Sequence, residues 1–376
     1  MAIVALERRW SLMEALEYAT FENPKWMLVM TACPLVCLPG ILLNLAIIYI
    51  TVYKVSSAYK WFVANLAVSD LLFALVIGVG QPVMLMSALT GLVHSLEHNT
   101  ACTLLSFANG TLGINMAFCL LLISYSRYAA MRWPDDDYQR WFGSGRAALR
   151  LCLGTALVSA LCESPMLWLI FEQRETTPNA TAADPGDPNF CTPMLSAASS
   201  LPRQLSLLLC IPPFTSSCAG AVIASYLVYR HVRRRQRLAT GEDGAVPAGL
   251  QEALQLVKAV LVQVCAFQAV ASPEFVFVVW SALQGSSAPW WLGEPAMLLY
   301  SSNTGLDALA TLTIVKHYRR AFLQLQARTF RCTTTQFDAV TRRQTVIAVR
   351  PASKKKASVP AAKYCVRQSH PCQIEA

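Results

Sequence analysis

Four carboxylate side chains interrupt otherwise apolar stretches of this chain: Asp70, Glu163, Glu274 and Asp307. A carboxylate at the depth of a lipid bilayer is costly, so such residues commonly bind ligands or handle ions and protons. The alternative for each is a neutral carboxyl group that neighbouring helices satisfy with hydrogen bonds, and Glu163 is expected to be structural in this sense. A fifth charged residue, Arg127, ends an apolar run that begins at Cys102. Its guanidinium group could cap the carbonyls of a docked helix or extend to lipid phosphate.

The elements that carry these charges are expected to be membrane-spanning helices. The chain is 55% hydrophobic and only 14% charged, whereas a soluble domain has about 25% charged residues. A spanning helix needs roughly 20 apolar residues. Seven windows meet this requirement: Trp26–Tyr53, Trp61–Leu89, Ala101–Tyr125, Leu151–Phe171, Leu205–Tyr229, Ala259–Leu283 and Pro295–Val315. We therefore expect an all-α membrane protein, a seven-transmembrane helix bundle.

The distribution of basic residues predicts the orientation of the bundle. With the N-terminus outside, few basic residues face outward, namely Arg8, Arg9, Lys25, Arg174 and Arg203. The remaining Lys and Arg residues then face the cytoplasm, as the positive-inside rule requires. The net charge of +9 is thus a topology signal, and no nucleic-acid partner is expected.

Two features mark the expected outer side. Of the 13 cysteines, Cys102 and Cys191 are the ones that fall there, and an oxidising compartment favours a disulfide between them. Asn179 opens an Asn-Ala-Thr glycosylation acceptor on the same side. The expected organisation is an extracellular N-terminus (1–25), the seven-helix domain (26–316), a short amphipathic eighth helix along the inner interface (317–330) and a disordered cytoplasmic tail (331–376).

Short motifs occur along the chain at characteristic spacings. They are Asn44, the run Leu66-Ala67-Val68-Ser69-Asp70, Cys102 placed 25 residues before Arg127, Cys191, Phe267 with Pro273, the run Asp307-Ala308-Leu309-Ala310-Thr311, and Tyr318. Together they resemble the rhodopsin-like (class A) family of G-protein-coupled receptors, over roughly residues 24–330. The resemblance implies a disulfide between Cys102 and Cys191 and a kink at Pro273 beside Phe267.

The resemblance also implies what the protein does. It indicates a plasma-membrane receptor that passes the signal of an extracellular ligand (a peptide, a lipid or a small molecule) to a heterotrimeric G protein, with arrestin as a further partner. The run Ser126-Arg127-Tyr128 would form the G-protein coupling site, where Arg127 meets the C-terminus of the α subunit. Cys332 stands where relatives are palmitoylated, although a plain cytosolic thiol is the alternative.

Departures from the family pattern concern its activation switch. Ser126 replaces the usual acidic partner of the arginine, Ala271 replaces the tryptophan of the sixth helix, and Thr311 replaces the tyrosine of the seventh. Helix five has Gly220 or Ala221 where a tyrosine is usual. The loss of the acidic partner predicts raised basal signalling. A receptor-like protein that does not couple to a G protein is the alternative.

Polar residues of the inner half would form a core that the family uses to bind sodium: Asn44, Asp70, Asn303, Thr304 and Asp307. Carboxylates and neutral oxygens suit a hard cation. Met116, however, stands where a serine is expected on the third helix. A hydrogen-bonded network without sodium is the alternative.

By family register, the ligand cavity would be lined by Gln81, Asn109, Gly113, Glu274, Phe275, Met297 and Ser301. Asn109 replaces the aspartate of amine receptors, which argues against a biogenic amine. Ser301 replaces the lysine that binds retinal, so no retinal is expected. Glu274 could pair with a cationic or peptide ligand, or it could be neutral and hydrogen-bonded to Gln81 or to a backbone carbonyl.

Two other classes of protein, enzymes and transporters, fit the sequence less well. The five histidines show no metal-ligand spacing within a span and no nucleophile motif occurs, so no enzyme is expected. An ion-coupled transporter could use the intramembrane carboxylates. Transporters, however, show paired repeats and broken helices in matching halves, and the sequence shows neither.

Overall fold

The computed structural model of the protein describes residues 28–55, 60–89, 95–168, 201–239, 248–284 and 290–327. All regular structure in these ranges is helical, as predicted. The elements are η3 (Leu28–Ala32), α3 (Cys33–Tyr53), α4 (Lys60–Leu75), η4 (Val76–Gly80), α5 (Gln81–Leu89), α6 (Ser95–Arg132), α7 (Asp135–Tyr138), η5 (Gln139–Gly143), α8 (Gly145–Glu163), α11 (Leu201–Ala239), α12 (Ala248–Gln284) and α13 (Trp290–Ile314). After a bend at Val315 the chain is again helical over residues 316–327.

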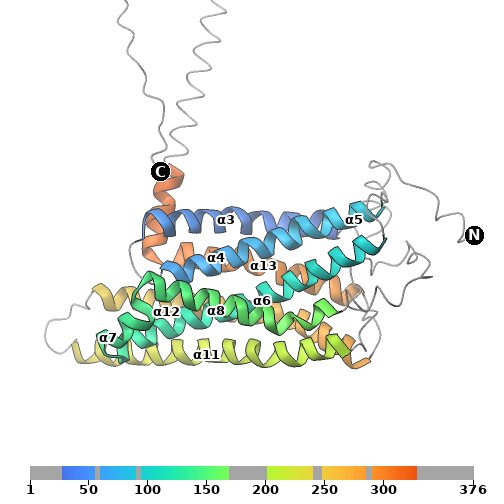
Figure 1. Ribbon diagram of the computed structural model, residues 1–376. Helices are drawn as coiled ribbons and strands as arrows, with labels where there is room; N and C mark the ends of the chain where they lie inside the picture. The colour runs from blue at the N-terminus through green and yellow to red at the C-terminus, as the bar shows by residue number, and fades with distance from the viewer. Residues whose placement is uncertain are drawn as a thin grey trace, which may run out of the picture. The chain divides into compact units, whose positions relative to one another are not determined.

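The long helices lie side by side in one unit that ends at Arg319 (Figure 1). Helix α3 packs between α13 and α4, and α4 packs on α6. Helix α6 contacts α11, α11 contacts α12, and α12 returns to α13, while α8 lies against α6 and α11. The contacts therefore close a ring that α8 joins from one side, which is the expected seven-helix bundle.

Large apolar side chains face outward and several polar side chains are buried, as in a membrane protein. Within the part of the chain that the structure describes, six helices are long and apolar enough to cross a bilayer: Met30–Tyr53, Lys60–Met84, Thr100–Arg132, Gly145–Glu163, Gln204–Arg235 and Val257–Val276. Large apolar residues such as Leu35 and Leu208 point outward, with 68% and 67% of their surface exposed. Asp70 and Asp307, by contrast, are 1% exposed. Helix α13 completes the bundle by packing on α3 and α12.

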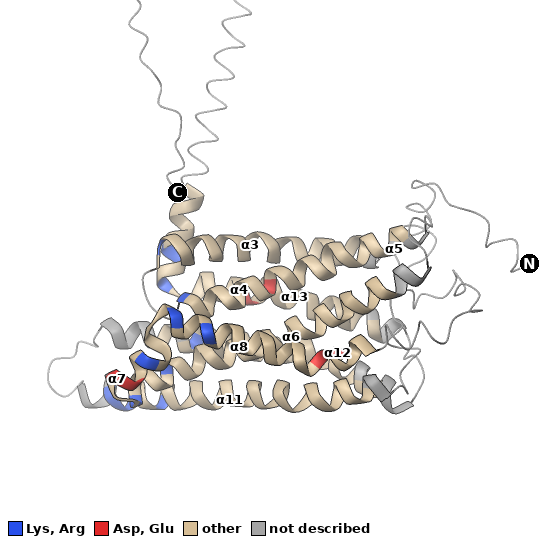
Figure 2. Ribbon diagram, viewed as in Figure 1, with Lys and Arg blue, Asp and Glu red and all other residues tan. Residues whose placement is uncertain are grey.

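Several helices extend beyond the apolar windows that the sequence predicts. Helix α6 begins at Ser95 and ends at Arg132, and α11 continues to Ala239. Apolar windows mark only the part of a helix in lipid, because a helix can continue into water with polar residues. The described Lys and Arg residues gather at one end of the bundle, around α7 (Figure 2). This end is the predicted cytoplasmic one.

Glycines let two helices approach closely at the polar core. A Cβ atom added to Gly40 of α3 would lie 2.3 Å from Thr304 Oγ1 of α13. Small residues at such contacts bring backbones together in membrane bundles. The close approach allows Asn44, one turn along α3, to reach the backbone of α13.

Candidate functional site

The predicted coupling residues lie near the predicted cytoplasmic end of α6, where α11 and α12 come together: Ser126, Arg127 and Tyr128. Ser126 is 1% exposed, and its hydroxyl donates to the Ile123 carbonyl at 2.9 Å within the same helix. Arg127 is half-buried. Tyr128 packs against buried residues of the two neighbouring helices. The predicted coupling residues are therefore at the junction of three helices.

We call this junction the inner cluster. Its buried members are Val228 and Val232 of α11 with Val257 of α12, and its partly buried members are Tyr128, Met131, Tyr229, Leu254 and Leu261. The cluster holds the inner end of α12 against α6 and α11 by apolar packing. This cluster was not predicted from the sequence, although valines spaced four residues apart on α11 are the pattern of one helix face.

The predicted polar core comes together in the structure. Asn44 Nδ2 donates to the Gly40 carbonyl at 2.9 Å and to the Thr304 carbonyl at 3.0 Å, so it links α3 to α13. Asn303 Nδ2 donates to Asp307 Oδ2 at 2.8 Å. Asn44, Asp70 and Asp307 line one small cavity of about 10 Å³.

Gln263 is a member of this core that the sequence analysis missed. Its Nε2 donates to the Asp307 carbonyl and to Thr311 Oγ1, both at 2.9 Å. Gln263 is 3% exposed and belongs to α12, whereas both acceptors belong to α13. It therefore ties α12 to its neighbour α13. The signal in the sequence that could have identified Gln263 is a polar glutamine within an apolar stretch.

The core is rich in oxygen atoms that need donors. Five buried side-chain oxygens have no hydrogen-bond partner among the described residues: Asn44 Oδ1, Asp70 Oδ1, Asn115 Oδ1, Asn303 Oδ1 and Asp307 Oδ1. A set made only of oxygen acceptors suits a hard cation or water molecules. The donor set therefore fits the sodium ion that the resemblance implies, although the cavity volume is near the lower limit for one water molecule.

An aromatic row lies on the outer side of the polar core. It consists of Phe73, Tyr300, Phe267, Phe214 and Phe275, contributed by α4, α13, α12 and α11. The Tyr300 ring packs edge-on against Phe73 at a centroid distance of 4.9 Å and lies 6.2 Å from Phe267. On α13, Tyr300 precedes the polar core residue Asn303 by about one turn. The row thus lies next to the polar core along α13, and its member Phe275 also belongs to the predicted ligand cavity.

Tyr300 occupies the bundle centre because α6 has a glycine there. The hydroxyl oxygen of Tyr300 is 2.2 Å from the place where a Cβ atom of Gly113 would lie. Sequence reasoning placed Gly113 in the ligand cavity and missed Tyr300. Ala271 stands where the family has a tryptophan on the sixth helix. In this chain an aromatic ring from a different helix, that of Tyr300 on α13, lies beside Phe267 of α12.

Glu163 links three helices. It is 9% exposed, and Ser206 Oγ of α11 donates to its Oε2 at 2.8 Å. A Cβ atom added to Gly110 of α6 would lie 2.2 Å from Glu163 Oε1. These contacts between α8, α11 and α6 agree with the structural role that was expected for Glu163.

Comparison with known proteins decides the family. A family model described as 7 transmembrane receptor (rhodopsin family) matches residues 43–307. The chain belongs to this family. The crystal structure of squid rhodopsin has the same fold, with a TM-score of 0.55 and 17% identity over 82% of this chain and 88% of that one. No curated protein matches the chain. The protein is therefore a multi-pass membrane receptor and not an enzyme.

The other predicted ligand-cavity residues of the receptor differ in exposure. Gln81, Asn109, Glu274, Phe275 and Met297 are half-buried. Ser301 is 0% exposed, and its hydroxyl donates to the Met297 carbonyl at 2.7 Å within α13. The Ser301 hydroxyl is thus satisfied by its own helix. Pro273 lies inside α12, between Phe267 and the predicted cavity residues Glu274 and Phe275.

Some predictions for the receptor concern residues outside the described ranges. Cys102 at the outer part of α6 is 1% exposed and is disulfide-bonded. Cys191 lies outside the described residues, so its pairing with Cys102 stays a prediction. Asn179, Cys332, the N-terminal residues 1–25 and the tail 331–376 also lie outside these ranges. Their glycosylation, palmitoylation and disorder stay predictions.

Proposed function

We propose that this receptor passes the signal of an extracellular ligand to a heterotrimeric G protein in the plasma membrane. Its N-terminus would be extracellular, because the described Lys and Arg residues gather at the opposite end of the bundle (Figure 2). The ligand would enter between the outer halves of the helices. Glu274 favours a cationic or peptide ligand, because a carboxylate in such a cavity can form a charge-assisted hydrogen bond.

The observation that carries this proposal is that Arg127 directly precedes Tyr128, a member of the inner cluster, on α6. The cluster is the contact between the inner end of α12 and helices α6 and α11. If α12 moves away, the three helix ends leave a groove with Arg127 in its wall. A guanidinium group in that position can bind the terminal carbonyls of a docked helix.

The resting state would be held by packing and not by an ion pair at residue 126. Ser126 is buried, and its hydroxyl is used within α6. Without an acidic side chain there, no ion pair with residue 126 has to be broken before Arg127 can meet a docked helix. Raised basal signalling is the expected result.

The test is a comparison of basal second-messenger levels in cells that express the receptor or its Arg127→Ala variant. Arg132→Ala is the matched control, since Arg132 is exposed and lies five residues further along α6. Surface expression of all three proteins is measured by antibody labelling. A basal signal that Arg127→Ala abolishes and Arg132→Ala preserves supports coupling, and an unchanged signal in Arg127→Ala contradicts it.

A second candidate function is that of a receptor-like partner without G-protein coupling. The observation that favours it is the replacement of three switch residues, with Ser126, Ala271 and Thr311 in their places. Under this alternative the receptor and Arg127→Ala give the same signal as untransfected cells. Arrestin recruitment, measured by proximity labelling, then tests whether the inner face engages any transducer.

A further inference from the structure

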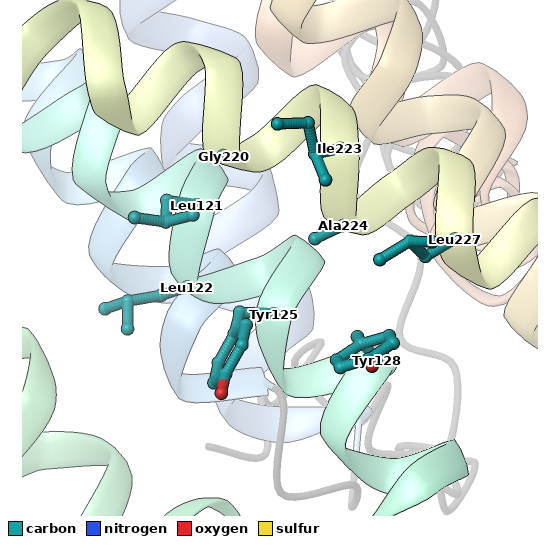
Figure 3. A pocket seen from close by; sticks show the side chains of 8 residues that line it. All are labelled: Leu121, Leu122, Tyr125, Tyr128, Gly220, Ile223, Ala224 and Leu227. Carbon is teal, nitrogen blue, oxygen red and sulfur yellow. The ribbon is translucent and has the colours of Figure 1, made fainter.

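The hollow between α6 and α11 on the side of the bundle carries no charge. It has a volume of about 480 Å³, and its lining consists of leucines, an isoleucine, an alanine, a glycine and two tyrosines (Figure 3). It therefore offers no partner to a charged ligand. The charged side chains of the bundle interior lie elsewhere.

The outer half of the bundle contains two carboxylates among its described side chains. Glu163 of α8 is 9% exposed, and Glu274 of α12 is half-buried. None of the side chains described in this half is a lysine or an arginine, because the described Lys and Arg residues gather at the opposite end (Figure 2). Negative charge at membrane depth is costly unless a positive group or a proton neutralises it.

The two carboxylates belong to one region of the interior. Both lie within electrostatic range of the Tyr300 hydroxyl, which sits against Gly113 of α6. Glu163 meets the same helix about one turn further out, where its Oε1 lies 2.2 Å from the position of a Cβ atom on Gly110. The glycines thus let Glu163 and Tyr300 lie against the backbone of α6, on the side that Glu274 also approaches.

Further oxygen acceptors lie beside Glu163 along α6. Asn109 Oδ1 and Thr111 Oγ1, on either side of Gly110 in the sequence, are buried and have no hydrogen-bond partner among the described residues. Glu163 Oε2 accepts from Ser206, but a carboxylate has about four lone-pair sites. An ammonium group supplies three donors and no acceptor. It therefore suits these surroundings.

Helix α11 connects the level of Glu163 with the level of Glu274. Ser206 and Phe214 are eight residues apart on one face of α11, a distance of about 12 Å along the helix. Ser206 donates to Glu163 at one end. At the other end the Phe214 ring stacks on Phe275, the neighbour of Glu274, with a centroid distance of 6.3 Å. A ligand that spans this face needs a positive charge at each end and an apolar chain between.

We propose that the ligand of this receptor is a straight-chain diamine whose two ammonium groups pair with Glu163 and Glu274. The inference rests on the proposed function, because it names the class of the extracellular ligand. Each ammonium forms charge-assisted hydrogen bonds with one carboxylate, and the methylene chain packs beside the rings of Phe214 and Phe275. Residue 109, where amine receptors have an aspartate, is an uncharged asparagine here and makes no ion pair. A monoamine leaves one carboxylate without a counter-charge, so the second ammonium gives selectivity.

The test measures binding to the full-length purified receptor in phosphatidylcholine nanodiscs by isothermal titration calorimetry. The probes are straight-chain diamines from diaminopropane to diaminooctane, each compared with the monoamine of the same carbon chain. In the wild type the best diamine is expected to bind at least about tenfold more tightly than its monoamine, because a hydrogen bond to a charged group contributes about that much. Glu163→Gln and Glu274→Gln should each remove this advantage. Glu163→Gln keeps an oxygen that can accept from Ser206, so the link between α8 and α11 is retained.

Asp137→Asn is the matched control, because Asp137 is exposed on α7 at the basic end of the bundle. It removes one carboxylate and should keep the wild-type ratio of affinities. Equal affinities for diamine and monoamine in the wild type, or an advantage that persists in either glutamine variant, would overturn the proposal. Loss of the advantage in Asp137→Asn would also overturn it. The assay measures binding alone, and basal signalling of Arg127→Ala needs no added ligand, so failure of this proposal is distinguishable from failure of the proposed function.

Discussion

The hydroxyl oxygen of Tyr300 lies 2.2 Å from the position that a Cβ atom of Gly113 would occupy. These two residues therefore depend on each other: the aromatic side chain reaches the bundle centre only because α6 has no side chain there. Tyr300 in turn packs on Phe73 and Phe267.

Gly113→Ala is expected to force Tyr300 out of its place. Overpacking of this kind costs about 1–3 kcal/mol, so the apparent Tm of the purified receptor should fall. Tyr300→Phe removes the atom that clashes, and the double variant Gly113→Ala/Tyr300→Phe should recover most of the loss. Equal Tm values for Gly113→Ala and the double variant would show that the hydroxyl is not the cause.

Gln263→Leu is expected to loosen α12 from α13, since it removes both hydrogen bonds that Gln263 donates to α13. Hydrogen bonds between membrane helices contribute roughly 0.6 kcal/mol each. A total near 1 kcal/mol corresponds to about a fivefold change in the population of receptors in which α12 has separated from α13. Basal signalling should therefore rise. Val262→Leu, at a 49% exposed neighbour on the same helix, should leave the signal unchanged.

Ser126→Asp is expected to lower basal second-messenger levels. The new carboxylate can pair with Arg127 in the resting state and hold it away from a docked helix, an effect of roughly 1 kcal/mol. Ser126→Asn is the neutral control of nearly the same shape. If both substitutions change the signal equally, the effect comes from side-chain size and not from the charge.

Sodium is expected to raise the Tm of the receptor if it binds at the polar core. A ligand present at a hundredfold excess over its Kd stabilises by about 2.7 kcal/mol. Tm is compared in sodium chloride and choline chloride for the wild type and for Asp70→Asn. A sodium-specific rise that Asp70→Asn removes supports the ion, and equal Tm values in both salts support the hydrogen-bonded network.

Much of the architecture could be predicted from the sequence, because long apolar windows with few charges have few alternatives in a membrane protein. The residues of the polar core could also be predicted. Asn44, Asp70 and Asp307 are polar side chains at membrane depth, and such residues stand out against an apolar background.

The contacts that depend on how each helix is rotated about its axis could not be predicted. Tyr300 has the same spacing in the sequence as ordinary core residues. Gln263 is polar at membrane depth, but the sequence does not tell which helix supplies its hydrogen-bond acceptors. The valines of the inner cluster likewise mark one face of α11 without identifying the helix that this face meets.

The apolar nature of the inner cluster determines which physical variables control the resting state. Ion pairs at a membrane boundary weaken as salt screens them, but contacts among Val228, Val232 and Val257 have no charge to screen. Apolar contacts near water weaken on cooling. The packing within the inner cluster should therefore be insensitive to ionic strength and should weaken in the cold.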